Sequence, residues 1–249
     1  MPRLESHDVH LWRVATTIPP VLYRTFWSTL SEAEKAQATR FRFDHLRTRY
    51  VASQGWLREL LGRYAGVPPE RVTFRAGPRG KPSLAVEPGQ AAMEPTLEFN
   101  LSHSGDLAVA AFSLGRAVGV DVEQIRPEVA ADSIPERYFT PEEQAGLARL
   151  PETDRIQGFF ACWTRKEAYM KGRGEGLHLG LDTFEVSVDP NGPAALVRSD
   201  KYPGDPSTWS IQDFDPGPGY RGAVAVEGRD VRLVAFAEPP APPPREGFE

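Results

Sequence analysis

The sequence has almost no cysteine, because Cys162 is the only one among 249 residues. A single thiol cannot form a disulfide within the chain, which excludes the small secreted domains that depend on disulfide staples. The chain is long enough, and at 40% hydrophobic residues apolar enough, to bury a core without such staples. We therefore expect one large domain or two fused smaller ones, folded in a reducing compartment.

Long hydrophobic runs and an excess of positive charge are also missing. No stretch approaches the roughly 18 apolar residues of a membrane span. The first residues, "MPRLESHDVHLW", lack the basic segment and apolar run of a secretory signal. The formal net charge is -5, whereas general nucleic-acid binders need a basic surface. We expect a cytoplasmic protein with neither a membrane nor a nucleic acid as its partner.

Common nucleotide-binding loops are absent as well. The sequence contains no GxxxxGK[ST] loop, and "GRGEGL" follows a helical pattern rather than a strand, so it is a poor dinucleotide fingerprint. Any phosphate-bearing ligand must therefore be met by a local cluster of cations.

Two long segments have helical spacing. The first spans 30–67, where Ser31 and Glu34 form a capping-box pattern, and the second spans 155–174 and ends at glycine. Between them, "LEFNLSHSGDLAVAAFSLGRAVGVDVE" predicts two or three short strands, and "FTPEEQ" predicts a further helix. Four later segments alternate as strands: "FEVSVD", "WSIQDFD", "YRGAVAVEG" and "VRLVAFAE". We also expect a polar loop around "VEPGQAAMEP" and a disordered proline-rich tail from Pro239.

The segment "VGVDVEQI", residues 118–125, places two carboxylates on an apolar strand. Side chains alternate across a strand, so Asp121 and Glu123 share one face while the valines share the other. Two adjacent anions repel each other unless water, a base or a metal ion compensates them. The pair predicts either a ligand site or the solvated face of an edge strand.

A second set of polar residues lies on the predicted helix 155–174. Steps of four place Trp163, Glu167 and Lys171 on one face, with Phe159 one turn earlier. Glu167 and Lys171 also have the favourable order of a surface ion pair, which is the alternative interpretation. If Glu167 converges with Asp121 and Glu123, the three hard oxygen ligands suit Mg²⁺ and a substrate phosphate.

Cations that could meet such a phosphate are present in two turn-rich stretches. "GPRGKP" presents Lys81, and "FNLSHSG" presents Ser102, His103 and Ser104. Arg49 on the first helix is a further candidate. Each of these residue types is more often merely solvated, so no single one of them carries the argument.

Taken together, these motifs resemble the 4'-phosphopantetheinyl transferases, in particular the long, surfactin-synthetase type. The matching stretches are "GKP" at 80–82, "NLSHSG" at 100–105, "GVDVE" at 119–123, "FFACWTRKEAYMKGRGEGL" at 159–177 and the "RFRF" helix. They occur in the family's order and cover nearly the whole chain to about residue 236. The resemblance implies an α+β fold, a pseudo-dimer of two similar halves with coenzyme A in the cleft between them. We place the halves at 1–117 and 118–238, followed by the tail at 239–249.

The resemblance also implies roles for individual residues. Asp121, Glu123 and Glu167 match the ligands of Mg²⁺, for which Mn²⁺ is an alternative, and Glu167 is in addition a candidate base for the incoming serine. Lys171 matches the lysine near the pyrophosphate. The residues that match the coenzyme A 3'-phosphate site are Arg49, Lys81 and His103, with Ser102 beside them.

One further acid matches the family and one pair of lysines does not. Glu143 in "FTPEEQ" matches an acid of the second half. Where the family often carries two phosphate-contacting lysines, this chain has Glu34 and Gln37, with Lys35 or Arg40 as candidate substitutes. This departure concerns coenzyme A affinity rather than the chemistry.

The predicted activity is Mg²⁺-dependent transfer of 4'-phosphopantetheine from coenzyme A to a serine of an apo acyl or peptidyl carrier protein, with release of 3',5'-ADP. Two other functions use the same residues: a metal-dependent nuclease, which would need a basic groove, and a non-enzymatic module that binds coenzyme A or a carrier protein. Because one chain supplies both sides of the predicted cleft, we expect a monomer.

Overall fold

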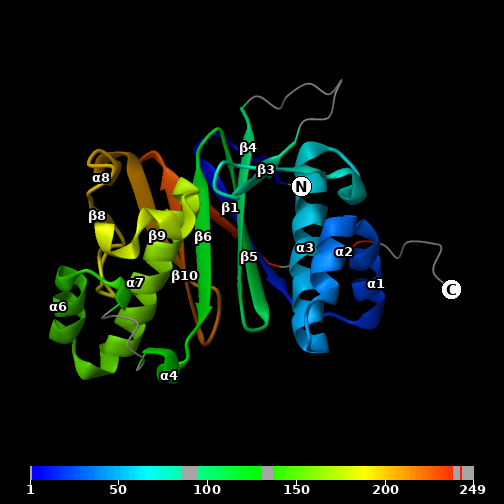
Figure 1. Ribbon diagram of the computed structural model, residues 1–249. Helices are drawn as coiled ribbons and strands as arrows, with labels where there is room; N and C mark the ends of the chain where they lie inside the picture. Colours follow the sequence, from blue (N-terminus) through cyan, green and yellow to red (C-terminus); the bar gives the residue numbers. More distant parts are fainter. Residues whose placement is uncertain (1, 86–94, 131–136, 238–241, 243–249) are drawn as a thin grey trace.

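The computed structural model describes residues 2–85, 95–130, 137–237 and 242, and it shows a mixed α+β protein (Figure 1). Two β-sheets pack face to face in the middle of the molecule, and helices cover their outer faces. This confirms the predicted α+β class. The loop predicted around 86–95 and the tail predicted from residue 239 fall almost wholly outside the described residues.

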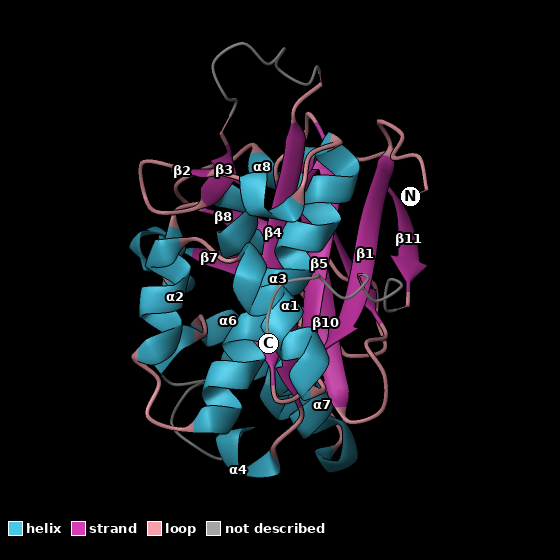
Figure 2. Ribbon diagram, turned by 90° about the vertical axis from the view of Figure 1, so that its right-hand side faces the viewer, coloured by secondary structure: helices cyan, strands magenta, loops and turns pink. Residues whose placement is uncertain are grey.

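The first part of the chain builds one sheet and the helices that cover it. In chain order its elements are β1 (Asp8–Ala15), α1 (Pro20–Thr29), α2 (Glu32–Thr39), α3 (Asp44–Ala65), β2 (Phe74–Ala76), β3 (Pro82–Leu84), β4 (Leu97–Ser104) and β5 (Leu107–Leu114). The four-stranded sheet has the order β11-β1-β5-β4, in which β11 (Arg232–Phe236) comes from the end of the chain, while β2 and β3 pair separately. Figure 2 shows α1 and α3 in front of this sheet.

The second part builds a smaller sheet against helix α7. Its elements are β6 (Val118–Gln124), α4 (Pro127–Ala130), α6 (Pro141–Arg149), α7 (Glu152–Arg173), β7 (Phe184–Val186), β8 (Leu196–Ser199), α8 (Asp205–Thr208), β9 (Trp209–Phe214), β10 (Tyr220–Glu227) and β11 (Arg232–Phe236). The three-stranded sheet has the order β6-β10-β9, and β7 pairs with β8. The helix predicted after "FTPEEQ" and the four later strands are confirmed.

The first predicted helix is wrong in one respect, because two helices replace it. The capping box of Ser31 and Glu34 starts α2 as predicted, but α2 ends at Thr39 and α3 begins only at Asp44. Phe43 between them has an extended backbone, with φ -106° and ψ 133°. The turn lets α2 fold back on α3, where Arg58 pairs with Glu34 at 2.8 Å. A tertiary contact has thus overridden a continuous helical pattern.

The two sheets meet through a core of branched aliphatic side chains. Val118, Val120 and Val122 of β6 are fully buried, and they pack with residues of β1, β5 and β10: Val9, Leu11, Val109, Ala111, Val224 and Val226. The predicted alternation along β6 is therefore confirmed. Because the valines face the first sheet, Asp121 and Glu123 face the opposite side, where α7 lies.

Strand β1 was not predicted, and it receives the end of the chain. β11 pairs with β1 in parallel, and Arg232 binds Asp8 through Nε at 2.7 Å. Buried polar residues, including Asp8 and His10, conceal β1 in the sequence. The last strand of the predicted second half thus joins the sheet of the first half, while the boundary at residue 117 stays a prediction.

Candidate active site

Strand β6 and helix α7 approach each other unusually closely at a glycine. A Cβ atom on Gly119 would lie 2.1 Å from the carbonyl oxygen of Ala168 and 2.2 Å from the amide nitrogen of Gly172. Since no side chain fits there, glycine allows the helix to lie directly on the strand. The acids of β6 are thereby brought next to Glu167 and Lys171, as their predicted convergence requires.

Asp121 is the most buried acid of this group, at 2% exposure. Its Oδ1 accepts hydrogen bonds from Lys171 Nζ at 2.6 Å and from Ser102 Oγ at 2.8 Å. Its Oδ2 is buried and has no hydrogen-bond partner within the described part of the chain. A buried carboxylate oxygen without a partner is costly, so this atom is open to a donor or a cation that binds there.

The other two carboxylates carry raised pKa values. Burial, reinforced by the charge of Asp121, raises the pKa of Glu123, while a hydrogen bond from Ser104 Oγ at 2.7 Å opposes the rise. Burial and the charges of Asp121 and Glu123 raise the pKa of Glu167 to about 7, against the opposing effect of Lys171. The alternative of a fully solvated acid face is excluded, because Asp121 is buried and Glu123 and Glu167 are only partly exposed.

Lys171 supplies the positive charge of the group. Its Nζ donates to Asp121 and, at 2.9 Å, to Ser102 Oγ, while 29% of its side chain is exposed. Among the residues that the structure describes, no three His, Cys, Asp or Glu side chains are grouped so that they could hold a metal ion as they stand. The site combines the ammonium of Lys171, the hydroxyl of Ser102 and the carboxylates of Asp121, Glu123 and Glu167.

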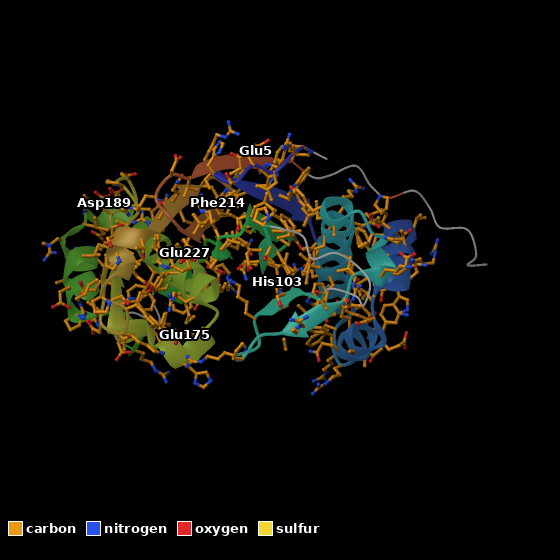
Figure 3. The ribbon with its side chains drawn as sticks, turned by 90° about the horizontal axis from the view of Figure 1, so that it is seen from above. Glu5, His103, Glu175, Asp189, Phe214 and Glu227 are labelled. Atoms are coloured by element: carbon orange, nitrogen blue, oxygen red, sulfur yellow. The ribbon has the colours of Figure 1, made fainter. Side chains whose placement is uncertain are left out.

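Two of the residues predicted to bind phosphate, His103 and Arg49, are exposed or partly exposed. His103 is the penultimate residue of β4 and is exposed, near the middle of the molecule when it is seen from above (Figure 3). Desolvation by the surrounding protein atoms and the charge of Lys171 lower the pKa of His103. Arg49 is paired with Asp106 at 2.7 Å and is 33% exposed. Both are accessible to a ligand, and their role in phosphate binding stays a prediction.

Lys81 has an arrangement that its sequence motif did not indicate. Its Nζ donates to the carbonyl oxygens of Val118 and Gly172, each at 2.9 Å. Burial lowers the pKa of Lys81. The ammonium thus joins the start of β6 to the end of α7, and its assignment to the 3'-phosphate stays a prediction.

The residues at the family's lysine positions, Glu34 and Gln37, lie on α2. Glu34 completes the capping box and pairs with Arg58. Lys35 pairs with Glu32 at 2.8 Å, and Arg40 Nη1 donates to Gln37 at 3.3 Å. These side-chain partners of Lys35 and Arg40 are residues of α2 and not Asp121. The role of the two cations as substitutes for the family's lysines stays a prediction.

Glu143 is the further acid that the resemblance indicated, and it lies in the core away from the Asp121 group. It caps α6, and its carboxylate pairs with Lys166 at 2.6 Å with both side chains buried. Sequence reasoning missed Lys166, which is next to Glu167 in α7 but points to Glu143 and Phe184. It also missed Asn100, whose even spacing with Ser102 and Ser104 was the available signal.

Within the described ranges, no helix is long and apolar enough to cross a membrane. This agrees with the absence of long apolar runs.

Comparison with known proteins gives the family. Residues 117–225 match the model of the 4'-phosphopantetheinyl transferase superfamily, and residues 20–114 match that of the 4'-phosphopantetheinyl transferase N-terminal region. The chain is 39% identical over 225 residues to the 4'-phosphopantetheinyl transferase HetI of Nostoc sp., covering 90% of both chains. It is 31% identical over 197 residues to the transferase psf-1 of Bacillus pumilus, covering 79% of this chain and 78% of the relative. It is 25% identical over 217 residues to the transferase Sfp of Bacillus subtilis, covering 86% of this chain and 91% of the relative. The resemblance that the motifs indicated is confirmed, and the chain belongs to the 4'-phosphopantetheinyl transferase superfamily.

Proposed function

We propose that this chain transfers 4'-phosphopantetheine from coenzyme A to a serine of an apo acyl or peptidyl carrier protein. The observation that carries the proposal is the contact of Lys171 with Asp121 beside Glu167, in a chain of this family. The serine oxygen bonds to the phosphorus next to pantetheine, and the bond from that phosphorus to the leaving oxygen breaks. The electron pair of that bond leaves with 3',5'-ADP.

Glu167 is suited to accept the proton of the serine hydroxyl. A general base works best when its pKa lies near the working pH, and the pKa of Glu167 is raised to about 7. In the metal-free protein this value suits a base, and the roles of ligand and base for Glu167 both remain part of the proposal. Glu167 is partly exposed, so a partner's serine can approach its carboxylate.

Lys171 is suited to stabilise the leaving phosphate. Its ammonium lies at the edge of the site, is partly exposed and is held by Asp121 and Ser102. An ammonium can donate three hydrogen bonds, and these two contacts leave one donor. We propose that this donor binds the oxygen on which negative charge develops.

Asp121, Glu123 and Glu167 would hold Mg²⁺, or Mn²⁺ in its place. The test of fit is the Oδ2 of Asp121, which is buried and unpartnered in the described structure, together with Glu123 and Glu167, whose pKa values are raised by burial and by the charge of Asp121. A divalent cation would relieve both. When bound, Mg²⁺ neutralises the charge of the coenzyme A pyrophosphate.

The remaining parts of the proposal concern ligand binding and assembly. Arg49 and His103 are proposed to bind the 3'-phosphate, with Arg49 exchanging Asp106 for the ligand. The sheet with α3 and the sheet with α7 are proposed to be the two halves of a pseudo-dimer, with coenzyme A between them. We propose that the protein acts as a monomer in the cytoplasm.

Intact-mass analysis of several apo carrier proteins, after incubation with this protein, coenzyme A and Mg²⁺, tests the reaction. The expected result is a carrier that gains one phosphopantetheine while 3',5'-ADP accumulates. Binding of coenzyme A without any modified carrier would show a binding module instead. Cleavage of a nucleic acid without modification of a carrier would show the nuclease.

A further inference from the structure

Along the outer edge of strand β6, three backbone amides and one carbonyl bind side chains rather than another strand. On its inner side β6 pairs with β10, and on its outer side β4 lies alongside it (Figure 1). β4 and β6 belong to different sheets, with no backbone ladder between them. An unpaired strand edge presents free amides and carbonyls, which need other partners when they are buried.

Four side chains of the first part of the chain supply these partners. Three backbone amides of β6 donate to side chains of β4, at a constant separation of twenty residues: Val120 to Asn100 Oδ1 at 2.9 Å, Val122 to Ser102 Oγ at 3.4 Å, and Gln124 to Ser104 Oγ at 3.0 Å. The carbonyl of Val118, on the same edge, accepts from Lys81 Nζ at 2.9 Å. We call Lys81, Asn100, Ser102 and Ser104 the bridging side chains.

The two serines also orient the carboxylates. Ser102 accepts from the amide of Val122 and donates to Asp121. Ser104 repeats the pattern, because it accepts from the amide of Gln124 and donates to Glu123. A hydroxyl has one donor and two acceptor positions, so one group can bind the backbone and the preceding carboxylate together.

Lys81 extends this arrangement to α7. Its second contact is the carbonyl of Gly172, next to Lys171. The same ammonium therefore holds the strand that carries Asp121 and the helix that carries Lys171. A backbone ladder would merge β6 into the first sheet, whereas side chains hold it alongside with its acids turned toward α7.

We propose that the bridging side chains are positioning residues: they set the register of β6 against β4 and thereby fix Asp121 and Glu123 opposite Lys171. This assigns a role to Asn100 and Ser104, and it gives Lys81 and Ser102 a role that does not require contact with a phosphate. The effect on transfer rests on the proposed function, whereas the effect on the strand edge does not.

The first test measures amide hydrogen exchange in the protein without metal or coenzyme A. In Ser104→Ala, the amide of Gln124 should exchange about five- to tenfold faster, because one hydrogen bond is lost. Ser104→Thr keeps the hydroxyl and should restore protection. The matched control is Ser113→Ala, which removes a buried serine hydroxyl of β5 that binds the carbonyl of Arg116 and not β6. Unchanged exchange at Gln124 in Ser104→Ala would overturn the proposal.

The second test measures Mn²⁺ binding by calorimetry and the steady-state constants of transfer. Ser104→Ala should bind Mn²⁺ more weakly and lower kcat with little change in KM for coenzyme A, while Ser104→Thr and Ser113→Ala behave as wild type. A raised KM with unchanged Mn²⁺ binding would mean that Ser104 is a ligand contact, and the positioning role would be wrong. If even the wild-type protein modifies no carrier, the proposed function fails, while the exchange result still decides the strand edge.

Discussion

Helix α7 carries two lysine–carboxylate pairs that differ in how completely they are satisfied. Lys166 is fully buried and donates to both oxygens of Glu143, at 2.7 and 2.6 Å, and to the carbonyl of Phe184 at 2.7 Å. Glu143 also accepts from the amides of Thr140 and Val186, each at 2.9 Å. Every donor of this ammonium is used, and no room is left for a ligand.

The pair of Lys171 and Asp121 is open by comparison. Lys171 is 29% exposed, and within the described chain Asp121 keeps one buried oxygen without a partner. The two pairs lie five residues apart on one helix and have the same chemistry. The difference shows that an unsatisfied group, rather than the presence of a buried charge, separates a candidate site from a structural ion pair.

The largest effect on stability should follow from breaking the buried pair of Lys166 and Glu143, which we call the closed pair. Glu143→Ala leaves Lys166 charged and buried, so the free energy of unfolding should fall by about 3 to 5 kcal/mol. Urea denaturation followed by tryptophan fluorescence measures this. The double variant Glu143→Leu with Lys166→Met should recover much of the loss, because it removes both charges. A single variant as stable as wild type would show that the closed pair is not structural.

A smaller effect should distinguish Glu167 by its pH dependence. Its folded-state pKa is about 7 and its usual value is 4.5, so the folded protein holds more protons between these values. Stability of the metal-free protein should therefore fall as pH rises from 4.5 to 7. Glu167→Gln removes this loss, and at pH 8 it should be more stable than wild type by about 1 to 2 kcal/mol.

The check is the melting temperature of both proteins across this pH range. The advantage of Glu167→Gln should shrink as the pH falls toward 4.5 and vanish well below it, where the carboxyl is protonated in both the folded and the unfolded state. An advantage that does not change with pH would mean that Glu167 is not desolvated as the structure indicates.

No effect at all is expected from mixing two inactive proteins. Asp121 and Glu167 lie together in one chain, so Asp121→Ala and Glu167→Ala should not complement each other when they are combined. Sedimentation of the active protein should give the mass of one chain. Recovered transfer in the mixture would show that the site is shared between chains, and the pseudo-dimer would have to be abandoned.

The sequence predicts those features that depend on local periodicity. A period of two places Asp121 and Glu123 on one face of β6, and a period close to four aligns Glu167 with Lys171 on α7. Both patterns survive in the structure because each element buries its apolar side. The capping boxes at Ser31 and Thr140 are equally local and start α2 and α6.

Features that depend on the approach of distant segments were not predictable in this way. The two carbonyl partners of Lys81 are brought together only by the packing of β6 against α7, so the sequence did not indicate them, while its predicted contact with a phosphate stays a prediction. Similarly, nothing near Glu143 in sequence indicates that Lys166 will enclose it. Strand β1 was missed because its buried polar residues find partners such as Arg232 more than two hundred residues away.

The most direct measurement of the central claim compares Asp121→Asn with wild type in the carrier-protein assay. Both proteins are used at equal folded concentration, with coenzyme A and Mg²⁺, and the carrier is followed by intact mass. Asparagine keeps the shape of the side chain but removes the negative charge that pairs with Lys171. Transfer should therefore slow on the order of 10²- to 10³-fold while the protein stays folded. A folded Asp121→Asn protein that modifies the carrier at close to the wild-type rate would contradict the assignment of the open pair as the active site.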